Sequence, residues 1–272
     1  MNDSSPSEKL LPTRILAVVN QKGGVGKTTT AINLGTGLAA VGHRVLIIDL
    51  DPQANATTGL GAPPSPDVPN AYDLVLGSAK LADVVVKTAI PNLDLVPTSV
   101  ELSGAEVELV GMEQREFRLR QALEGQVDHY EYVLIDCPPA LGLLTLNALI
   151  AAHAVLVPLQ CEYYALEGMS HLVRTIERVK GTFNPRLEIQ GIVLTMYDRR
   201  NNLCDMVAQD VRGYFGAKVY ETVIPRNVRV SEAPSHGKPV LIYDMHCAGA
   251  QAYAHLAREV LRREQALRAI QP

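Results

Sequence analysis

Short apolar runs recur along the chain and are separated by stretches with helical spacing. Seven runs have the length of buried strands: 15–19, 44–50, 93–97, 132–136, 154–159, 189–196 and 218–224. Runs such as 45–48 (VLII) and 155–157 (VLV) contain no polar position, which is typical of strands covered on both faces. The alternation predicts an α/β fold, in which a mostly parallel twisted sheet has helices on both faces.

Helical spacing is clearest directly after the first strand and near the C-terminus. In residues 30–41, apolar positions with helical spacing are Ile32, Leu34, Leu38 and Val41. Near the C-terminus the apolar residues fall roughly on one face and the arginines lie elsewhere: Leu256, Val260, Leu267 and Ile270 against Arg258, Arg262, Arg263 and Arg268. We interpret this second pattern as a helix that packs on the sheet.

Length and local composition predict one domain with a short arm. The 272 residues can bury a sizeable core, and a single domain is expected over 14–272. Residues 1–13 are rich in Ser and Pro and poor in apolar side chains, which predicts a disordered N-terminal arm. This segment has neither the basic start nor the apolar centre of a signal peptide. Four prolines in 61–69 predict a loop.

Charge and cysteine usage narrow the functional classes. The net charge of −4 and the pI near 6.0 argue against a protein that binds nucleic acid constitutively through an overall positive field, so any DNA contact must be local or conditional. Four widely spaced cysteines without a C-x-x-C pair indicate neither a zinc site nor a disulfide framework. A reducing cytoplasm is the expected setting, and no run approaches the length needed to span a bilayer.

A glycine-rich segment at 20–29 (NQKGGVGKTT) lies between the first strand and the first helix. Glycines there allow backbone N–H groups to surround phosphate oxygens, and the helix N-terminus adds its positive dipole end. Lys27 would contact the β- and γ-phosphates, and the Thr28 hydroxyl would hold Mg²⁺. Gln21 occupies the first glycine position of the usual pattern, so the segment is the variant K-G-G-x-G-K-T, and Lys22 is an additional lysine. A glycine turn without a ligand is disfavoured because two lysines beside N–H donors suit an anion.

Three acidic residues follow strands that should end near this loop. Strand alternation sends Asp49 and Asp51 to the same side. We expect Asp49 to support the metal's water shell and Asp51 to orient the attacking water, the alternative being that either caps the following turn. Asp136 ends the apolar run 132–136 in the manner of a Walker B element, and would meet Mg²⁺ through water unless it is purely structural. Prolines at 138 and 139 make the segment that follows Asp136 stiff.

These segments resemble the ParA/Soj chromosome- and plasmid-partitioning ATPases, a branch of the MinD-like deviant Walker P-loop proteins. The resemblance runs from about residue 14 to the C-terminal helix and is carried by 20–29, 49–53 (DLDPQ), 136–139 (DCPP), 160–168 (QCEYYALEG) and 223–229 (VIPRNVR). It implies a P-loop NTPase fold, ATP and Mg²⁺ as cofactors, and an ATP-dependent sandwich homodimer in which Lys22 crosses to the partner's nucleotide.

The same resemblance implies roles for single residues. The catalytic residues would be Lys22, Lys27 and Asp51, of which Asp51 controls hydrolysis. Thr28, Asp49 and Asp136 would bind Mg²⁺ directly or through water. The nucleotide would lie against the loop and, at its adenine, against two later residues: Lys22, Gly23, Gly24, Val25, Gly26, Lys27, Thr28, Thr29, Pro225 and Asn227. One departure from the family is Ala54, where many relatives carry glycine, and it puts the backbone of that turn in doubt.

Non-specific double-stranded DNA and a ParB/Spo0J-like centromere-binding protein are the partners that the resemblance implies. The matching DNA-binding positions are Arg200 and Arg229, with Arg199 and Arg226 as neighbours, and the alternative for each is a solvated surface arginine. A dimer would present two copies of the patch, so DNA affinity would respond steeply to dimerisation and to salt. The expected location is the cytoplasm, in association with the nucleoid. The helix-turn-helix region of some plasmid relatives is absent, which disfavours operator-specific repression.

Two other functions share the lysine-bearing loop. A MinD-like division-site ATPase would use a terminal amphipathic helix to bind membranes, but the C-terminal segment lacks Trp and Phe, and Glu259 and Glu264 dilute its charge. A reductase like the nitrogenase iron protein would need cysteines placed to bridge a metal cluster, and the four here do not match that arrangement. The sequence therefore favours the partitioning ATPase.

Overall fold

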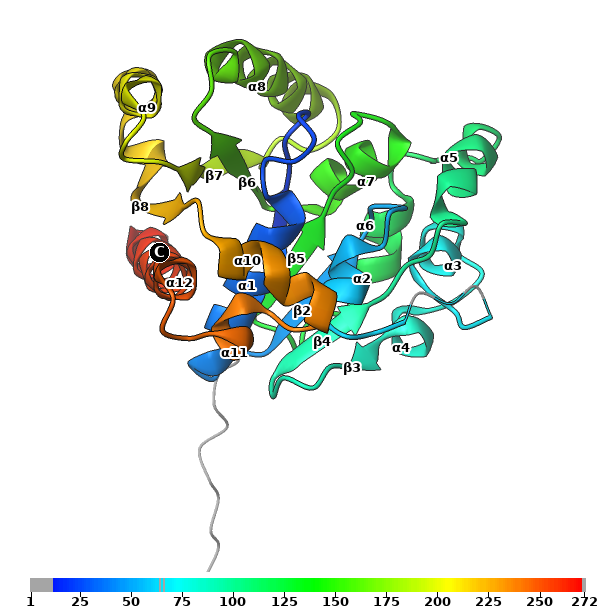
Figure 1. Ribbon diagram of the computed structural model, residues 1–272. Coiled ribbons are helices and arrows are strands. Elements are labelled where there is room, and N and C mark those ends of the chain that lie inside the picture. Colours follow the sequence, from blue (N-terminus) through cyan, green and yellow to red (C-terminus); the bar gives the residue numbers. More distant parts are fainter. Residues whose placement is uncertain (1–11, 64, 66, 271–272) are drawn as a thin grey trace, which may run out of the picture.

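A computed structural model describes residues 12–63, 65 and 67–270, and Figure 1 shows its arrangement. Eight strands form one sheet in the order β3-β4-β2-β5-β1-β6-β7-β8. Their bounds are β1 Arg14–Val18, β2 Val45–Asp49, β3 Val86–Lys87, β4 Leu93–Val96, β5 Tyr132–Asp136, β6 Ala154–Gln160, β7 Glu188–Tyr197 and β8 Val219–Pro225. The predicted α/β class with a mostly parallel sheet is confirmed, since every strand pair except β3–β4 is parallel.

Helices cover both faces of the sheet because side chains alternate along each strand (Figure 1). In β2, Leu46 and Ile48 pack on one face and Val45 and Ile47 on the other. The first face carries α3 Ala71–Leu76, α4 Leu81–Val84, α5 Leu102–Val110, α6 Arg118–Leu123, α7 Leu143–Ala151, α8 Ala165–Thr182 and α9 Asn202–Phe215. The second carries α1 Lys27–Ala40, α2 Asn55–Gly59, α10 Val228–Glu232, α11 Val240–Tyr243 and α12 Ala248–Ile270.

The seven predicted strands are present, and the predicted helix after the first strand is α1, which begins earlier, at Lys27. The sequence prediction missed β3, the antiparallel edge strand. Two residues are too few to show a periodicity, and only pairing with β4 makes them a strand. The predicted arm, 1–13, lies outside the described residues except for Pro12 and Thr13. Thr13 Oγ1 donates to the carbonyls of Val127 and Tyr130 at 3.1 and 2.8 Å. Two prolines of the predicted loop, at 64 and 66, also lie outside them.

The C-terminal helix α12 packs on the sheet, as its sequence pattern predicts. Tyr253, Leu256 and Val260 are buried against the face that α1 also covers. Glu259 is buried as well, and its two carboxylate oxygens accept from the backbone N–H groups of Glu221 and Thr222, both at 2.9 Å. The apolar side chains between Tyr253 and Val260 are thus buried within the molecule, whereas Leu267 is 38% exposed. The burial of this part of the face counts against the membrane-binding alternative. Across the described residues, no helix combines the length and the apolar character that crossing a bilayer requires.

Candidate nucleotide-binding site and neighbouring arginines

The glycine-rich loop joins the end of β1 to the start of α1, at the carboxyl end of the central strands (Figure 1). Gly24 and Gly26 have φ values of 74° and 86°, in the left-handed region that a side chain disfavours. Gly26 is the residue before α1, so this backbone turn directs the loop into the helix N-terminus. The loop therefore has the strand-to-helix geometry that phosphate binding requires.

Side chains outside the predicted set hold this loop in place. Buried Asn20 accepts a hydrogen bond from Lys22 N at 3.0 Å and donates to Pro158 O of β6 at 2.7 Å. Thr195 of β7 donates to Val25 O at 2.8 Å. These contacts attach the loop to two neighbouring strands. Asn20 lies in the recognised motif and could have been singled out, whereas nothing local in the sequence marks Thr195.

The two lysines of the loop have different surroundings. Lys27 is only 6% exposed, and its Nζ donates to Lys22 O at 3.1 Å. Burial lowers the pKa of Lys27, and the charges of Asp136 and Asp51 oppose that shift. The Lys22 side chain is 54% exposed and forms an ion pair with Glu162, in the segment between β6 and α8. One lysine is therefore enclosed by its own chain, and the other lies at the surface.

Asp136 is a buried carboxylate whose charge is only weakly compensated. It lies beside Asp49, because β2 and β5 pair with these two residues in register. Both oxygens of Asp136 are buried, and among the described residues none donates a hydrogen bond of good geometry to them, although the Thr28 side chain lies near enough to act as a weak donor. Burial, followed by the charge of Asp49, raises the pKa of Asp136 well above its usual value, while Thr28 and Lys27 favour the ionised form. An uncompensated buried carboxylate is costly, so its position beside Thr28 fits a metal ion.

Asp49 is engaged within its own segment. It accepts from Thr57 N at 2.8 Å, from Thr57 Oγ1 at 2.7 Å and from Asp51 N at 3.2 Å. Burial raises the pKa of Asp49 to about 6 against the opposing effect of these hydrogen bonds. Asp51 is also buried, and its Oδ1 accepts from Gln53 N at 3.1 Å. Through these hydrogen bonds Asp49 holds α2 against the end of β2. No local sequence pattern marks Thr57 as its partner.

Ala54, which stands where many relatives carry glycine, adopts a backbone conformation that is typical of glycine. Its φ of 54° lies in the left-handed region, and it is the residue that precedes α2. Glycine adopts this conformation without strain, whereas alanine pays for it sterically. The turn therefore keeps the shape that a glycine would favour, and Ala54 carries local backbone strain.

Three of the four predicted DNA-binding arginines line one hollow of about 600 Å³ at the ends of β7 and β8. Its lining includes Arg199, Arg200 and Arg226 together with Pro225, and α12 closes it with Gln251, Ala252 and His255. The fourth arginine, Arg229, lies in α10. Asn227 precedes that helix and accepts from Arg229 N at 2.9 Å, but does not line the hollow. Pro225 thus shares the hollow with three of the arginines, whereas Asn227 lies outside its lining.

The four cysteines are free thiols, and Cys137, Cys161 and Cys204 are buried. Burial raises the pKa of Cys137 well above its usual value, which suits a small buried side chain that fills space in the core. Within the part of the chain that the structure describes, no group of three or more His, Cys, Asp or Glu residues is placed to hold a metal.

Comparisons with known proteins identify the family. Residues 13–189 match the family described as AAA domain. The chromosome partitioning protein ParA of Caulobacter vibrioides is 62% identical over 256 residues, covering 93% of this chain and 96% of that protein. The chain belongs to the ParA/Soj family of chromosome-partitioning ATPases. The sporulation initiation inhibitor protein Soj of Bacillus subtilis is 53% identical over 247 residues, or 91% of this chain and 98% of that one.

A solved structure of another protein shares this fold. Cobyrinic acid a,c-diamide synthase from Mycobacterium smegmatis, determined with a bound ATP analog and magnesium, has a TM-score of 0.82 and 38% identity. The match covers 93% of this chain and 96% of that one. The predicted family and P-loop NTPase fold are therefore confirmed, and the chain is a partitioning ATPase of the ParA/Soj type.

Proposed function

We propose that ATP binding closes two copies of this chain over their nucleotides, and that the dimer then binds DNA without sequence preference. The supporting observation is the contrast between the two loop lysines. Lys27 is enclosed by its own loop, whereas Lys22 is exposed at the surface. A lysine at the surface can leave Glu162 and contact a nucleotide held by a second copy, which couples ATP binding to dimerisation.

ATP and Mg²⁺ are the cofactors, and the loop residues divide the work of binding them. The N–H groups of the loop and Lys27 bind the phosphates, and Thr28 and Asp136 hold the metal, whose charge offsets that of the phosphates. Asp49 adds a carboxylate beside Asp136. Asp51 orients the attacking water, and Pro225 and Asn227 contact the adenine.

The DNA surface consists of Arg199, Arg200, Arg226 and Arg229, and a dimer doubles it. Hydrolysis, slow until a ParB/Spo0J-like centromere-binding protein stimulates it, returns the chain to its monomeric form and releases the DNA. This cycle places the protein in the cytoplasm, on the nucleoid when ATP is bound.

DNA binding measured with ATP, with ADP and without nucleotide, at two salt concentrations, tests the proposal. We expect tight binding with ATP alone and a loss of that binding at the higher salt concentration. Equal binding in all three nucleotide states would contradict it. Co-sedimentation with anionic liposomes tests the MinD-like alternative, and ATP-dependent binding to lipid without binding to DNA would favour that function instead.

A further inference from the structure

The arginines proposed to contact DNA are paired with acidic side chains of their own chain. Arg200 forms a bidentate pair with Asp198, with Nε to Oδ1 at 3.0 Å and Nη2 to Oδ2 at 2.9 Å. Arg229 pairs with Glu232 at 3.0 Å and with Asp244 at 3.5 Å. Carboxylate and phosphate oxygens compete for the same guanidinium N–H groups. A DNA phosphate therefore competes with an acid at each of these arginines.

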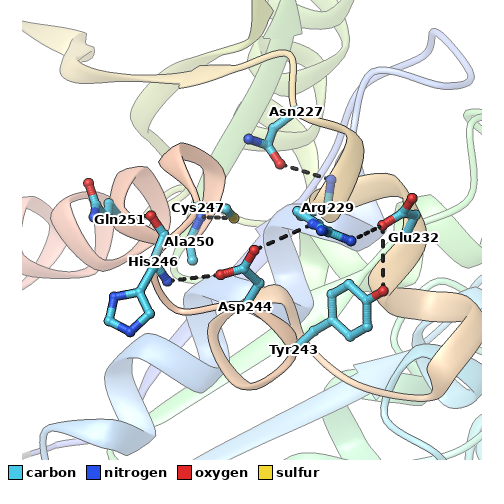
Figure 2. Close-up of polar contacts among 9 residues, drawn as sticks. All are labelled: Asn227, Arg229, Glu232, Tyr243, Asp244, His246, Cys247, Ala250 and Gln251. Carbon is cyan, nitrogen blue, oxygen red and sulfur yellow. Dashed lines mark hydrogen bonds and ion pairs between the residues drawn. The ribbon is translucent and has the colours of Figure 1, made fainter.

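The acids around Arg229 are held in position by further contacts. Figure 2 shows Glu232 and Asp244 on either side of the guanidinium. Glu232 also lies 3.5 Å from the Tyr243 hydroxyl, which donates to it, and Asp244 accepts from His246 N at 3.1 Å. We use "acid clamp" for Arg229 with Glu232 and Asp244. The acid clamp joins α10 to the segment that links α11 and α12.

In the hollow, Asp198 pairs with Arg200 as Glu232 and Asp244 pair with Arg229. Hydrogen bonds from Arg200 hold the pKa of Asp198 down to about 2, and the charge of Arg226 adds to this effect. Asp198 is therefore ionised at neutral pH. Four arginines share this surface with three carboxylates, so the formal charge of the group is +1. One copy of so weakly charged a patch binds DNA poorly.

We propose that Glu232, Asp244 and Asp198 lower the affinity of a single copy for DNA, so that stable binding requires the two patches of a dimer. This inference rests on the proposed DNA-binding function and specifies its regulation. The acids compete with phosphate at Arg229 and Arg200 and reduce the number of phosphates that each copy neutralises. Removing an acid frees an arginine and weakens the dependence of DNA binding on ATP.

Conservative variants test the acid clamp. Glu232→Gln and Asp244→Asn keep the shape of each side chain and remove its charge, and we expect each to tighten binding to a fluorescent DNA duplex by about two- to five-fold, measured by anisotropy with and without ATP. The salt dependence should steepen by about 0.9 in log–log slope for each arginine gained. Asp198→Asn should act in the same way through Arg200.

A matched control separates local pairing from net charge. Glu221→Gln removes the same charge from a side chain that is 84% exposed and pairs only with Arg262, at 3.8 Å, among the described residues. It should change affinity by less than the clamp variants do. In an Arg229→Gln background, Glu232→Gln should have no effect, because the arginine that it frees is gone. Thermal melting of every variant verifies that it is folded.

Several outcomes would overturn the inference. If the clamp variants gain no more than Glu221→Gln, or if the gain persists without Arg229, the acids do not compete with DNA. Weaker DNA binding in Glu232→Gln would mean that the acids position Arg229 instead of masking it. Failure of the proposed function looks different: the unmodified chain would show no ATP-dependent DNA binding, and Arg229→Gln would change nothing.

Discussion

Single residues at the nucleotide site show a conflict between stability and ligand binding. Among the described residues Asp136 is buried beside Asp49 with only weak compensation of its charge, and Ala54 holds a left-handed conformation that suits glycine. Each feature costs free energy of folding, and each lies close to the proposed nucleotide site. Substitutions at both positions can reveal that cost.

Asp136→Asn should stabilise the protein in the absence of nucleotide by about 1–3 kcal/mol at pH 7.5, because it removes the cost of burying a carboxyl group whose charge is only weakly compensated. The folded-state pKa of Asp136 is raised, so the stability that its protonated form contributes is complete below the unfolded pKa and is lost as pH rises through the folded pKa. The advantage of Asn should therefore shrink as pH falls towards the usual pKa of aspartate.

Urea unfolding across that pH range measures this effect, and Asp128→Asn, at an exposed position, is the matched control. With ATP present, added Mg²⁺ should raise the melting temperature of the unmodified chain more than that of the variant. A variant that is less stable at pH 7.5, or that responds to Mg²⁺ as the unmodified chain does, would show that Asp136 is a purely structural residue.

Ala54→Gly should increase the free energy of unfolding by about 0.5–1 kcal/mol, since relief of the left-handed strain exceeds the added entropy of the unfolded chain. The same chemical change at Ala40, the last residue of α1, should destabilise by a similar amount, because the backbone there is helical. Urea denaturation of both variants checks the opposite signs, and destabilisation by Ala54→Gly would contradict a strained turn.

At the scale of elements, side chains of α12 form hydrogen bonds with the backbone at the outer edge of the sheet. β8 pairs only with β7 among the described strands, so its outer edge needs other hydrogen-bond partners. Glu259 accepts from two backbone N–H groups of β8, and Arg263 donates to the carbonyls of Ala217 and Val219, both at 2.9 Å. Charged side chains of one helix therefore satisfy the edge of the sheet.

Glu259→Ala should lower the free energy of unfolding by about 2–4 kcal/mol, because it leaves two backbone donors without their acceptor and removes the carboxylate that pairs with Arg263. Glu221→Ala, at a side chain that is 84% exposed, should change it by less than about 0.5 kcal/mol. Chemical denaturation gives both values. Equal effects of the two substitutions would mean that the buried carboxylate does not support the edge.

At the scale of the whole molecule, assembly and turnover should depend on different residues. Lys22→Ala should keep the chain monomeric with ATP, since the exposed lysine is the group proposed to reach the second nucleotide. Asp51→Ala should bind ATP, form the dimer and fail to hydrolyse it, so that the dimer persists. Light scattering and phosphate release measure the two steps, with Lys180→Ala, an exposed residue of α8, as control. A normal ATP-dependent dimer in Lys22→Ala would remove the proposed role in trans.

Much of the fold and of the nucleotide site could be predicted from local patterns. Apolar runs identified seven strands, because a strand buried on both faces needs an unbroken apolar segment. The loop and Asp136 could be recognised because phosphate and metal binding restrict residue type at fixed spacing. Thr57, Thr195 and Glu162 could not be found in this way, since each acts on a residue that is distant in sequence or carries no motif of its own.

The sequence by itself determined which chemical groups this ATPase has: the glycines, both lysines, the acids at the strand ends and the four arginines. The tertiary structure decided their states. It buried Asp136 with little compensation of its charge, engaged Asp49 with Thr57, and placed Asp198, Glu232 and Asp244 against Arg200 and Arg229. Residue identity sets the chemistry of a group, whereas burial and neighbouring charge, which depend on the packing of the whole chain, set its protonation and its availability to a ligand.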